Sequence, residues 1–231
     1  MSFHGLEIGS TGPLEPQSPF QDRSVEQGFQ GTLIDADIES RVALLSLGTF
    51  GLFELLGGFD QTDTGRRIAI RQLETGAVGL FEGVFLTRIR DKRWIVLSIG
   101  SRSLPDGLDP HMDGTANGLM TVTDLSHGVG CLLLVGTNST TTLGRLCSIN
   151  LEEHSFAHTR SAYTSLAGVR ALILRWDHEH APAYFICVPR STSRYVRQAI
   201  MDELSEVDIV GHDTSGNLLS WPQGWKTPAG T

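Results

Sequence analysis

The chain has 231 residues, of which 40% are hydrophobic and 19% charged, a balance typical of a globular protein that buries a core. The net charge of −8 argues against nucleic-acid binding, because phosphate contacts need clustered Lys and Arg. No apolar run reaches the roughly 18 residues of a membrane span, and the N-terminus lacks the pattern of a secretory signal. Three widely spaced cysteines suit neither a disulfide framework nor a CxxC metal pair. We therefore expect a cytoplasmic protein without cofactor, metal or membrane partner.

The N-terminal third divides by composition. Residues 1–31 are rich in Gly, Pro, Ser and Gln, which predicts a flexible arm that becomes fixed when it docks onto a larger protein assembly. Residues 32–93 form an expected β-rich extension, and its first part, 32–58, fits either a short helix or a strand pair. Strand-like runs follow at evenly spaced positions and predict a β-meander: Arg67–Leu73, Val78–Ile89 with a break near Gly83, and Trp94–Ile99.

Residues 94–231 are expected to form one compact domain. After a polar loop at 101–118 we expect, in chain order, strands at 119–122 and 132–136 around the turn 126–130, a hairpin at 137–142, a strand at 143–150 and a helix at 159–176. A buried strand at 184–188, a helix capped by Ser191–Ser193 and ending at Leu204, a strand at 207–210 and a turn at 213–217 complete it. No internal repeat is visible. These elements predict an α+β fold in which a β-sheet sandwich packs with two helices.

Cys131 is the strongest candidate for a chemical nucleophile. It follows the turn Gly128-Val-Gly130 and opens an apolar run, and free N–H groups at the end of a turn favour a thiolate and can hold an oxyanion. Position alone favours the alternative of a small buried residue, since cysteine is among the most buried residue types. Cys147 and Cys187 lie within apolar runs and are expected in the core.

A series of short motifs resembles the chemoreceptor glutamine deamidase (CheD) family, which is related to the cytotoxic necrotizing factor toxins. In that family a strand leads through a Gly-rich turn into the nucleophilic cysteine, as Leu125–Cys131 does here. Further similar segments follow in the same order: Leu143–Leu151, Phe156–Thr159, Arg194–Val196 and His212–Asn217. The resemblance covers residues 94–231. It implies a CheD-like fold and a cysteine-dependent hydrolase that converts a protein glutamine to glutamate.

The histidine that the family uses as a base is absent from its expected place, which holds Ser148. Serine cannot act as a base at neutral pH, so we expect His154, just beyond that strand, to be recruited; His127 and His158 are alternatives. The threonine partner of the family is also replaced, by Leu125. For each histidine alone, a surface or capping role is the simpler interpretation.

Three functions therefore stay open. Cys131, with His154 and Ser148, belongs to a deamidase; or the domain keeps the fold as an inactive binding or structural module that docks onto a larger assembly; or the same cysteine serves a peptidase or acyl transferase. The cluster at 177–180 (Asp-His-Glu-His) is better explained as a solvated connection than as a metal site. His212–Gly216 is similarly expected to be a plain turn.

Overall fold

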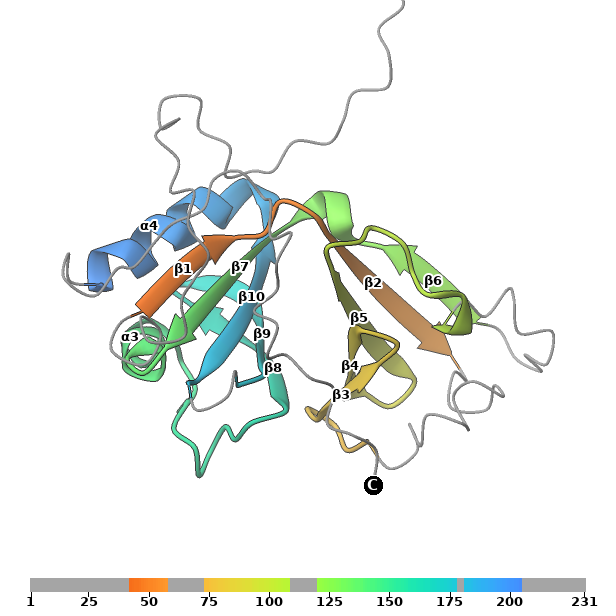
Figure 1. Cartoon of the computed structure of the whole chain (residues 1–231), viewed down its shortest axis with the longest axis horizontal. Helices are drawn as coiled ribbons and strands as arrows, with labels where there is room; N and C mark the ends of the chain where they lie inside the picture. Colours follow the sequence, from red (N-terminus) through yellow and green to blue (C-terminus); the bar gives the residue numbers. More distant parts are fainter. Residues whose placement is uncertain (1–41, 58–72, 109–119, 178–180, 205–231) are drawn as a thin grey trace, which may run out of the picture.

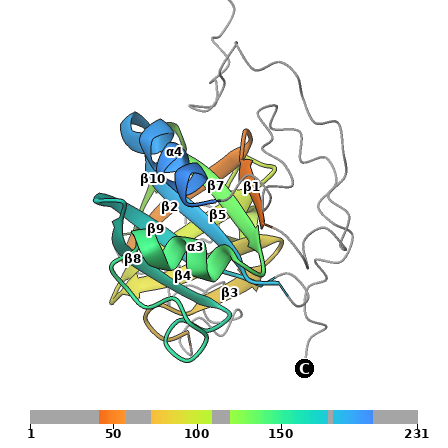
Figure 2. The same ribbon diagram turned by 90° about the vertical axis from the view of Figure 1, so that its left-hand side faces the viewer.

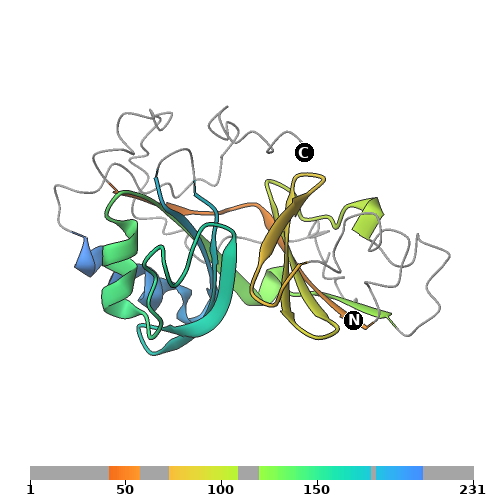
Figure 3. The same ribbon diagram turned by 90° about the horizontal axis from the view of Figure 1, so that it is seen from below.

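Two antiparallel β-sheets face each other across the centre of the molecule, and two helices cover the outer face of one of them (Figure 1). The structure is a computed structural model that describes residues 42–57, 73–108, 120–177 and 181–204. Seen from below, the two sheets stand side by side, and both helices lie on the outer side of one sheet (Figure 3). An α+β fold of sheets packed with two helices is therefore confirmed in its coarse form.

Each sheet has five strands. Sheet A has the order β1 (Val42–Ser46), β7 (Val129–Gly136), β10 (Ala183–Pro189), β9 (Val169–Arg175) and β8 (Arg160–Leu166). Sheet B has the order β3 (Val78–Phe81), β4 (Val84–Arg90), β5 (Arg93–Ile99), β2 (Phe50–Gly57) and β6 (Met120–Asp124). The helices are α3 (Ser139–Leu146) and α4 (Ser193–Glu203), and the short 3₁₀ turns are η3 (Asp106–Leu108), η4 (Ser126–Gly128) and η5 (Arg190–Thr192).

The two halves of the chain exchange their first strands. In the first half, β2 to β5 lie in sheet B while β1 lies at the edge of sheet A; in the second half, β7 to β10 lie in sheet A while β6 lies at the edge of sheet B. The other four strands follow one order in both sheets: β7-β10-β9-β8 in sheet A corresponds to β2-β5-β4-β3 in sheet B. Strands from both sides of the expected boundary at residues 93 and 94 thus share each sheet.

A matching hairpin turn supports this internal correspondence. Glu82 and Gly83 join β3 to β4, and Ala167 and Gly168 join β8 to β9, with positive φ at all four residues. Two residues with positive φ are the pattern of a type I′ turn, which suits the twist of a tight hairpin. The sequence shows no repeat because the two halves share topology and turn geometry rather than residues.

Alternation along each strand divides the apolar side chains between layers. One cluster lies between the sheets and includes Leu133 and Phe185 from sheet A with Phe85 from sheet B. The rings of Phe85 and Phe185 are 5.0 Å apart at their centroids. A second cluster lies between sheet A and the helices, which cover that face in Figure 2. A third lies on the outer face of sheet B and includes Trp94 and Leu108. Because the strands of sheet A are covered on both faces, runs such as 131–135 are apolar throughout.

Each link between the sheets is hydrogen-bonded to a strand of the other half of the chain, β2 or β7. Leu125 N donates to Leu52 O at 2.8 Å, and Leu52 N donates to Ser126 Oγ at 2.9 Å. The Ser126 hydroxyl donates in turn to Asp124 Oδ1 at 2.5 Å. Leu47, in the other link, donates its N–H to Cys131 O at 3.0 Å. These bonds fix the position at which the chain leaves one sheet and enters the other.

The predicted helix at 159–176 is wrong, because this segment is the hairpin of β8 and β9. Its apolar residues at intervals of four, three and four suggested one helical face. A spacing of four also keeps side chains on one face of a strand, and the interval of three spans the turn at Ala167 and Gly168. Ala162, Leu166, Val169 and Ile173 therefore all pack in the cluster beneath the helices. Helix and strand periodicity therefore coincide at these positions.

The hairpin predicted at 137–142 and the strand predicted at 143–150 are also wrong, since α3 occupies Ser139–Leu146. The β-branched residues Thr140 to Thr142 favour a strand by propensity. Packing overrides that preference, because Thr142 and Leu143 are buried on the side of α3 that contacts sheet A.

Most other elements in the described part are confirmed. They are the break at Gly83 between two strands, the strands near 94–99, 119–122 and 184–188, and the final helix. Within 32–58 the described part holds two strands and no helix, but the strands lie in different sheets and do not pair with each other. The arm 1–31, most of the run 67–73, the strand 207–210 and the turn 213–217 lie outside the described residues. Among the residues described, no helix is long and apolar enough to cross a membrane.

Replacing Ser126, whose hydroxyl accepts the Leu52 N–H bond, should destabilise the whole fold. In Ser126→Ala the buried Leu52 N–H loses its acceptor, and we expect the free energy of unfolding to fall by about 1–3 kcal/mol, measured by urea denaturation. The matched control is Ser148→Ala, since Ser148 is exposed and its hydroxyl donates to Ser165 O at 3.4 Å. Equal stability of the two variants would contradict a structural role for the crossing.

Candidate functional site

Cys131 lies inside β7, two residues after the strand begins at Val129, and not at the strand start as expected. Its side chain is fully buried, with 0% exposure, in the cluster between the sheets. Cys187 is directly opposite on β10, and the two sulfur atoms are 3.5 Å apart. Cys131 therefore pairs with another thiol within an apolar core.

The surroundings of Cys131 disfavour its ionised form. Burial raises the pKa of the Cys131 thiol well above its ordinary value, and the adjacent Cys187 thiol raises it further. A nucleophilic cysteine needs the opposite, a lowered pKa from a nearby cation, a helix N-terminus or a base. At neutral pH the Cys131 sulfur therefore keeps its proton.

The predicted partners Ser148 and His154 lie on the segment that follows α3. Leu151 and Phe156 of this segment pack in the cluster beneath the helices, whereas Cys131 faces the other side of sheet A. The His154 ring is 71% exposed and lies 3.5 Å from the Glu152 carboxylate. Ser148 is exposed as well. The structure does not bring these two residues to Cys131.

The other histidine of that region, His158, is held by contacts with Trp176 and Asp177. Its Nδ1 accepts a hydrogen bond from Asp177 N at 2.9 Å, and its ring packs on Trp176 with centroids 5.0 Å apart. Nearby, the buried Arg175 donates to Asp177 at 2.8 and 2.9 Å and to Phe156 O at 2.7 Å. This network fastens the segment after α3 to the ends of β9 and β10.

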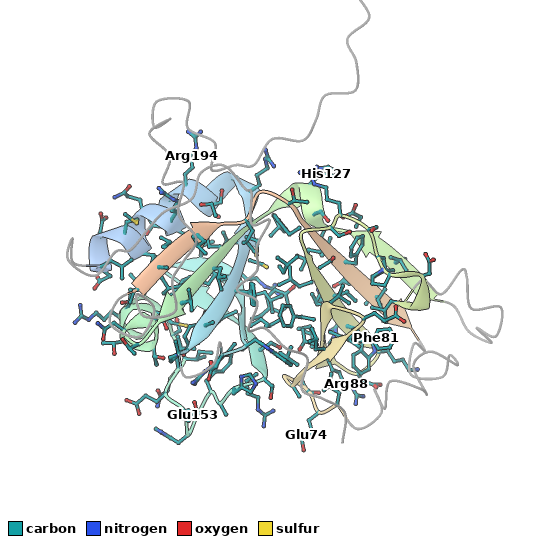
Figure 4. The ribbon with its side chains drawn as sticks, viewed as in Figure 1. Glu74, Phe81, Arg88, His127, Glu153 and Arg194 are labelled. Carbon is teal, nitrogen blue, oxygen red and sulfur yellow. The ribbon has the colours of Figure 1, made fainter. Side chains whose placement is uncertain are left out.

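The same Arg175 also pairs with Glu153, which lies at the lower side of the molecule in Figure 4. Asp177 is thus engaged in structural bonds, and residues 178–180 of the suggested metal cluster lie outside the described residues. In the described part of the chain, no group of three or more His, Cys, Asp or Glu is placed to hold a metal ion.

His127, the remaining histidine alternative, lines a surface depression of about 620 Å³. The depression lies between η4 and the segment where β10 passes through η5 into α4. Its other lining residues are Gly128, Pro189, Arg190, Ser191 and Arg194. Most of these residues are exposed, and none is acidic.

The sequence analysis named Arg194 only as part of a motif and did not single out Arg190. A signal was available, because the two arginines are four residues apart around the predicted start of a helix. The predicted caps Ser191–Ser193 do not act as helix caps in the expected way: Thr192 and Ser193 donate their hydroxyls to Pro189 O and Arg190 O. The proximity of His127 could come only from tertiary structure.

Comparison with known proteins shows the fold alone. No family model matches the chain, and no curated protein matches it significantly. A chain of the heterotetrameric sarcosine oxidase from Corynebacterium sp. U-96, solved in complex with pyrrole 2-carboxylate, is similar with a TM-score of 0.59 and 21% identity, covering 75% of this chain and 90% of that one. The glycine cleavage system aminomethyltransferase T from Bartonella henselae is similar with a TM-score of 0.58 and 13% identity. The match to it covers 78% of this chain but only 50% of the aminomethyltransferase.

The burial of the thiols predicts their order of alkylation. With iodoacetamide on the folded protein at neutral pH, we expect Cys147, which is partly exposed, to be modified first, and Cys131 and Cys187 to react only after denaturation. Peptide mass mapping over time would measure the three rates. Faster labelling of Cys131 than of Cys147 would contradict the buried, protonated state and restore the case for a nucleophile.

Proposed function

We propose that this chain is a non-catalytic subunit or docking module of a multi-subunit protein assembly. The observation that carries the proposal is the match to nearly the whole of one chain, 90% of its length, in a heterotetrameric enzyme. The same fold therefore occurs elsewhere as a separate chain inside a heteromeric complex. The likeness at 21% identity supports a common architecture, and the choice of assembly partner is part of the proposal.

The second structural neighbour supports the same direction. In the aminomethyltransferase the matched region is about half of a longer chain, so this fold has further protein beside it there too. In one neighbour the additional protein belongs to a complex, and in the other it belongs to the same polypeptide. A heteromeric oxidase of the sarcosine oxidase kind is the first assembly to test.

The geometry around Cys131 supports a role without catalysis. A cysteine hydrolase needs a thiolate, a base within hydrogen-bonding distance and access for the substrate. Cys131 is fully buried, its pKa is raised, and its sulfur contacts the Cys187 thiol and the Leu132 carbonyl. A packing role explains the same contacts with no further assumption.

Residues 1–31 are the proposed contact segment. Their composition, with few aliphatic residues, cannot repay the entropy of ordering alone, whereas binding to a partner can. This part of the proposal rests on sequence composition.

Glutamine deamidation by Cys131 stays a prediction from the family resemblance and is the second candidate function. What favours it is the retained cysteine after the turn Gly128–Gly130. Release of ammonia from glutamine-containing proteins by the wild type, and its loss in Cys131→Ala, would support it.

One purification separates the two candidates. We expect the tagged full chain, isolated from its own cells, to elute in a complex of fixed stoichiometry that re-forms from the purified partner and this chain. Cys131→Ala should form the complex equally well, because the thiol makes no contact outside the core. A variant lacking residues 1–31 should bind the partner at least tenfold more weakly.

A different result would contradict the docking proposal. A monomer at all concentrations tested, with Cys131-dependent ammonia release, would replace the docking proposal with the deamidase. Circular dichroism and the unfolding midpoint of each variant would show that the fold is retained.

A further inference from the structure

The depression beside η4 brings together two arginines and a histidine from two parts of the chain that are distant in sequence. His127 comes from the link between β6 and β7, whereas Arg190 and Arg194 come from the turn after β10 and from α4. Figure 4 shows His127 and Arg194 on the same upper side of the molecule. The convergence of these side chains, and not the helix end alone, defines the feature.

Its charge is opposite to that of the protein as a whole. The chain carries a net charge of −8, so its overall field repels anions. The residues that line the depression include two arginines and a histidine but no Asp or Glu. An anion that binds here must therefore be held by these local groups and not by the general field.

The chemistry of the two arginines suits a ligand with more than one anionic group. Arg190 lies in η5 and Arg194 in the first turn of α4, and each guanidinium presents a planar fork that matches carboxylate or phosphate oxygens. The His127 ring and the Ser191 hydroxyl add further hydrogen-bond donors. Both arginines already take part in interactions of their own, so a ligand would add to those contacts or displace them.

We propose that this depression binds a polyanionic small molecule carrying at least two phosphate or carboxylate groups. Its volume of about 620 Å³ falls within the range of roughly 300–1,000 Å³ that is common for small-molecule sites. Gly128 and Pro189 supply a part of the lining without long side chains, which leaves room for the body of the ligand. The site is independent of Cys131 and of the proposed docking function.

The test is calorimetric titration of the full chain at low salt with pyrophosphate, with citrate, and with neutral glycerol. We expect saturable binding of one or both anions at one site and none of glycerol. Arg194→Gln and Arg190→Gln should each weaken the binding about tenfold, because each removes one charge-assisted contact worth about 1.4 kcal/mol. A preference for pyrophosphate or for citrate would identify the ligand as a phosphate or a carboxylate.

The matched control is Arg145→Gln, which removes one exposed arginine on α3 that pairs with Glu203 at 3.3 Å. This variant should bind as the wild type does. Binding that is unchanged in the Arg190/Arg194 double variant, or that falls equally in Arg145→Gln, would overturn the proposal, as would the absence of any binding at millimolar anion. Unfolding midpoints close to that of the wild type would show that the variants are folded.

Discussion

The crossing of two chain segments between the sheets is the constraint on which the rest of the structure depends. Each half of the chain places its first strand in the other half's sheet, so neither five-stranded sheet is complete with one half alone. Ser126 satisfies Leu52 N–H at this crossing and is itself held by Asp124, while Leu47 bonds to Cys131 O. Because the crossing joins residues distant in sequence, the apolar layer between the sheets can close only when both halves are in place.

This arrangement also explains why the Cys131 thiol is buried whereas the depression beside His127 is open to solvent. β7 and β10 run side by side from the crossing into the core, so Cys131 and Cys187 meet where both faces of sheet A are covered. At the outer ends of the same two strands, the pair Val129 and Pro189 leads directly into η4 and η5. The Cys131 and Cys187 thiols are therefore enclosed. His127, Arg190 and Arg194 lie at the surface, just beyond the ends of the paired strands β7 and β10. A chemical role that needs contact with solvent is available only at the second of these places.

The errors of the sequence analysis have identifiable physical causes. In 159–176 the apolar residues recur at intervals of four, three and four, a pattern that fits one face of a helix. It also fits one face of a hairpin whose turn, at Ala167 and Gly168, spans the interval of three. The glycine at 168 was the overlooked signal, since a non-glycine residue rarely adopts the positive φ of a type I′ turn. In 139–146 local propensity favoured a strand, and burial of Thr142 and Leu143 against sheet A decided for a helix. The predictions of the break at Gly83, the final helix and the strand of Cys187 were correct, because there the hydrophobic pattern and the tertiary packing agree.

By itself the sequence determined that this is an α+β protein, that its strands near 94–99, 131–136 and 184–188 are buried, and that Cys131 follows a glycine turn within an apolar run. These properties are local: they depend on the order of polar and apolar residues along a few turns or strands. Only tertiary structure decided which face of sheet A receives the Cys131 sulfur, that Cys187 lies opposite it, and that His154 lies beyond the other face. It also decided that His127 approaches Arg190 and Arg194. Pairing between distant strands sets these distances, and no local pattern encodes which strands will be neighbours.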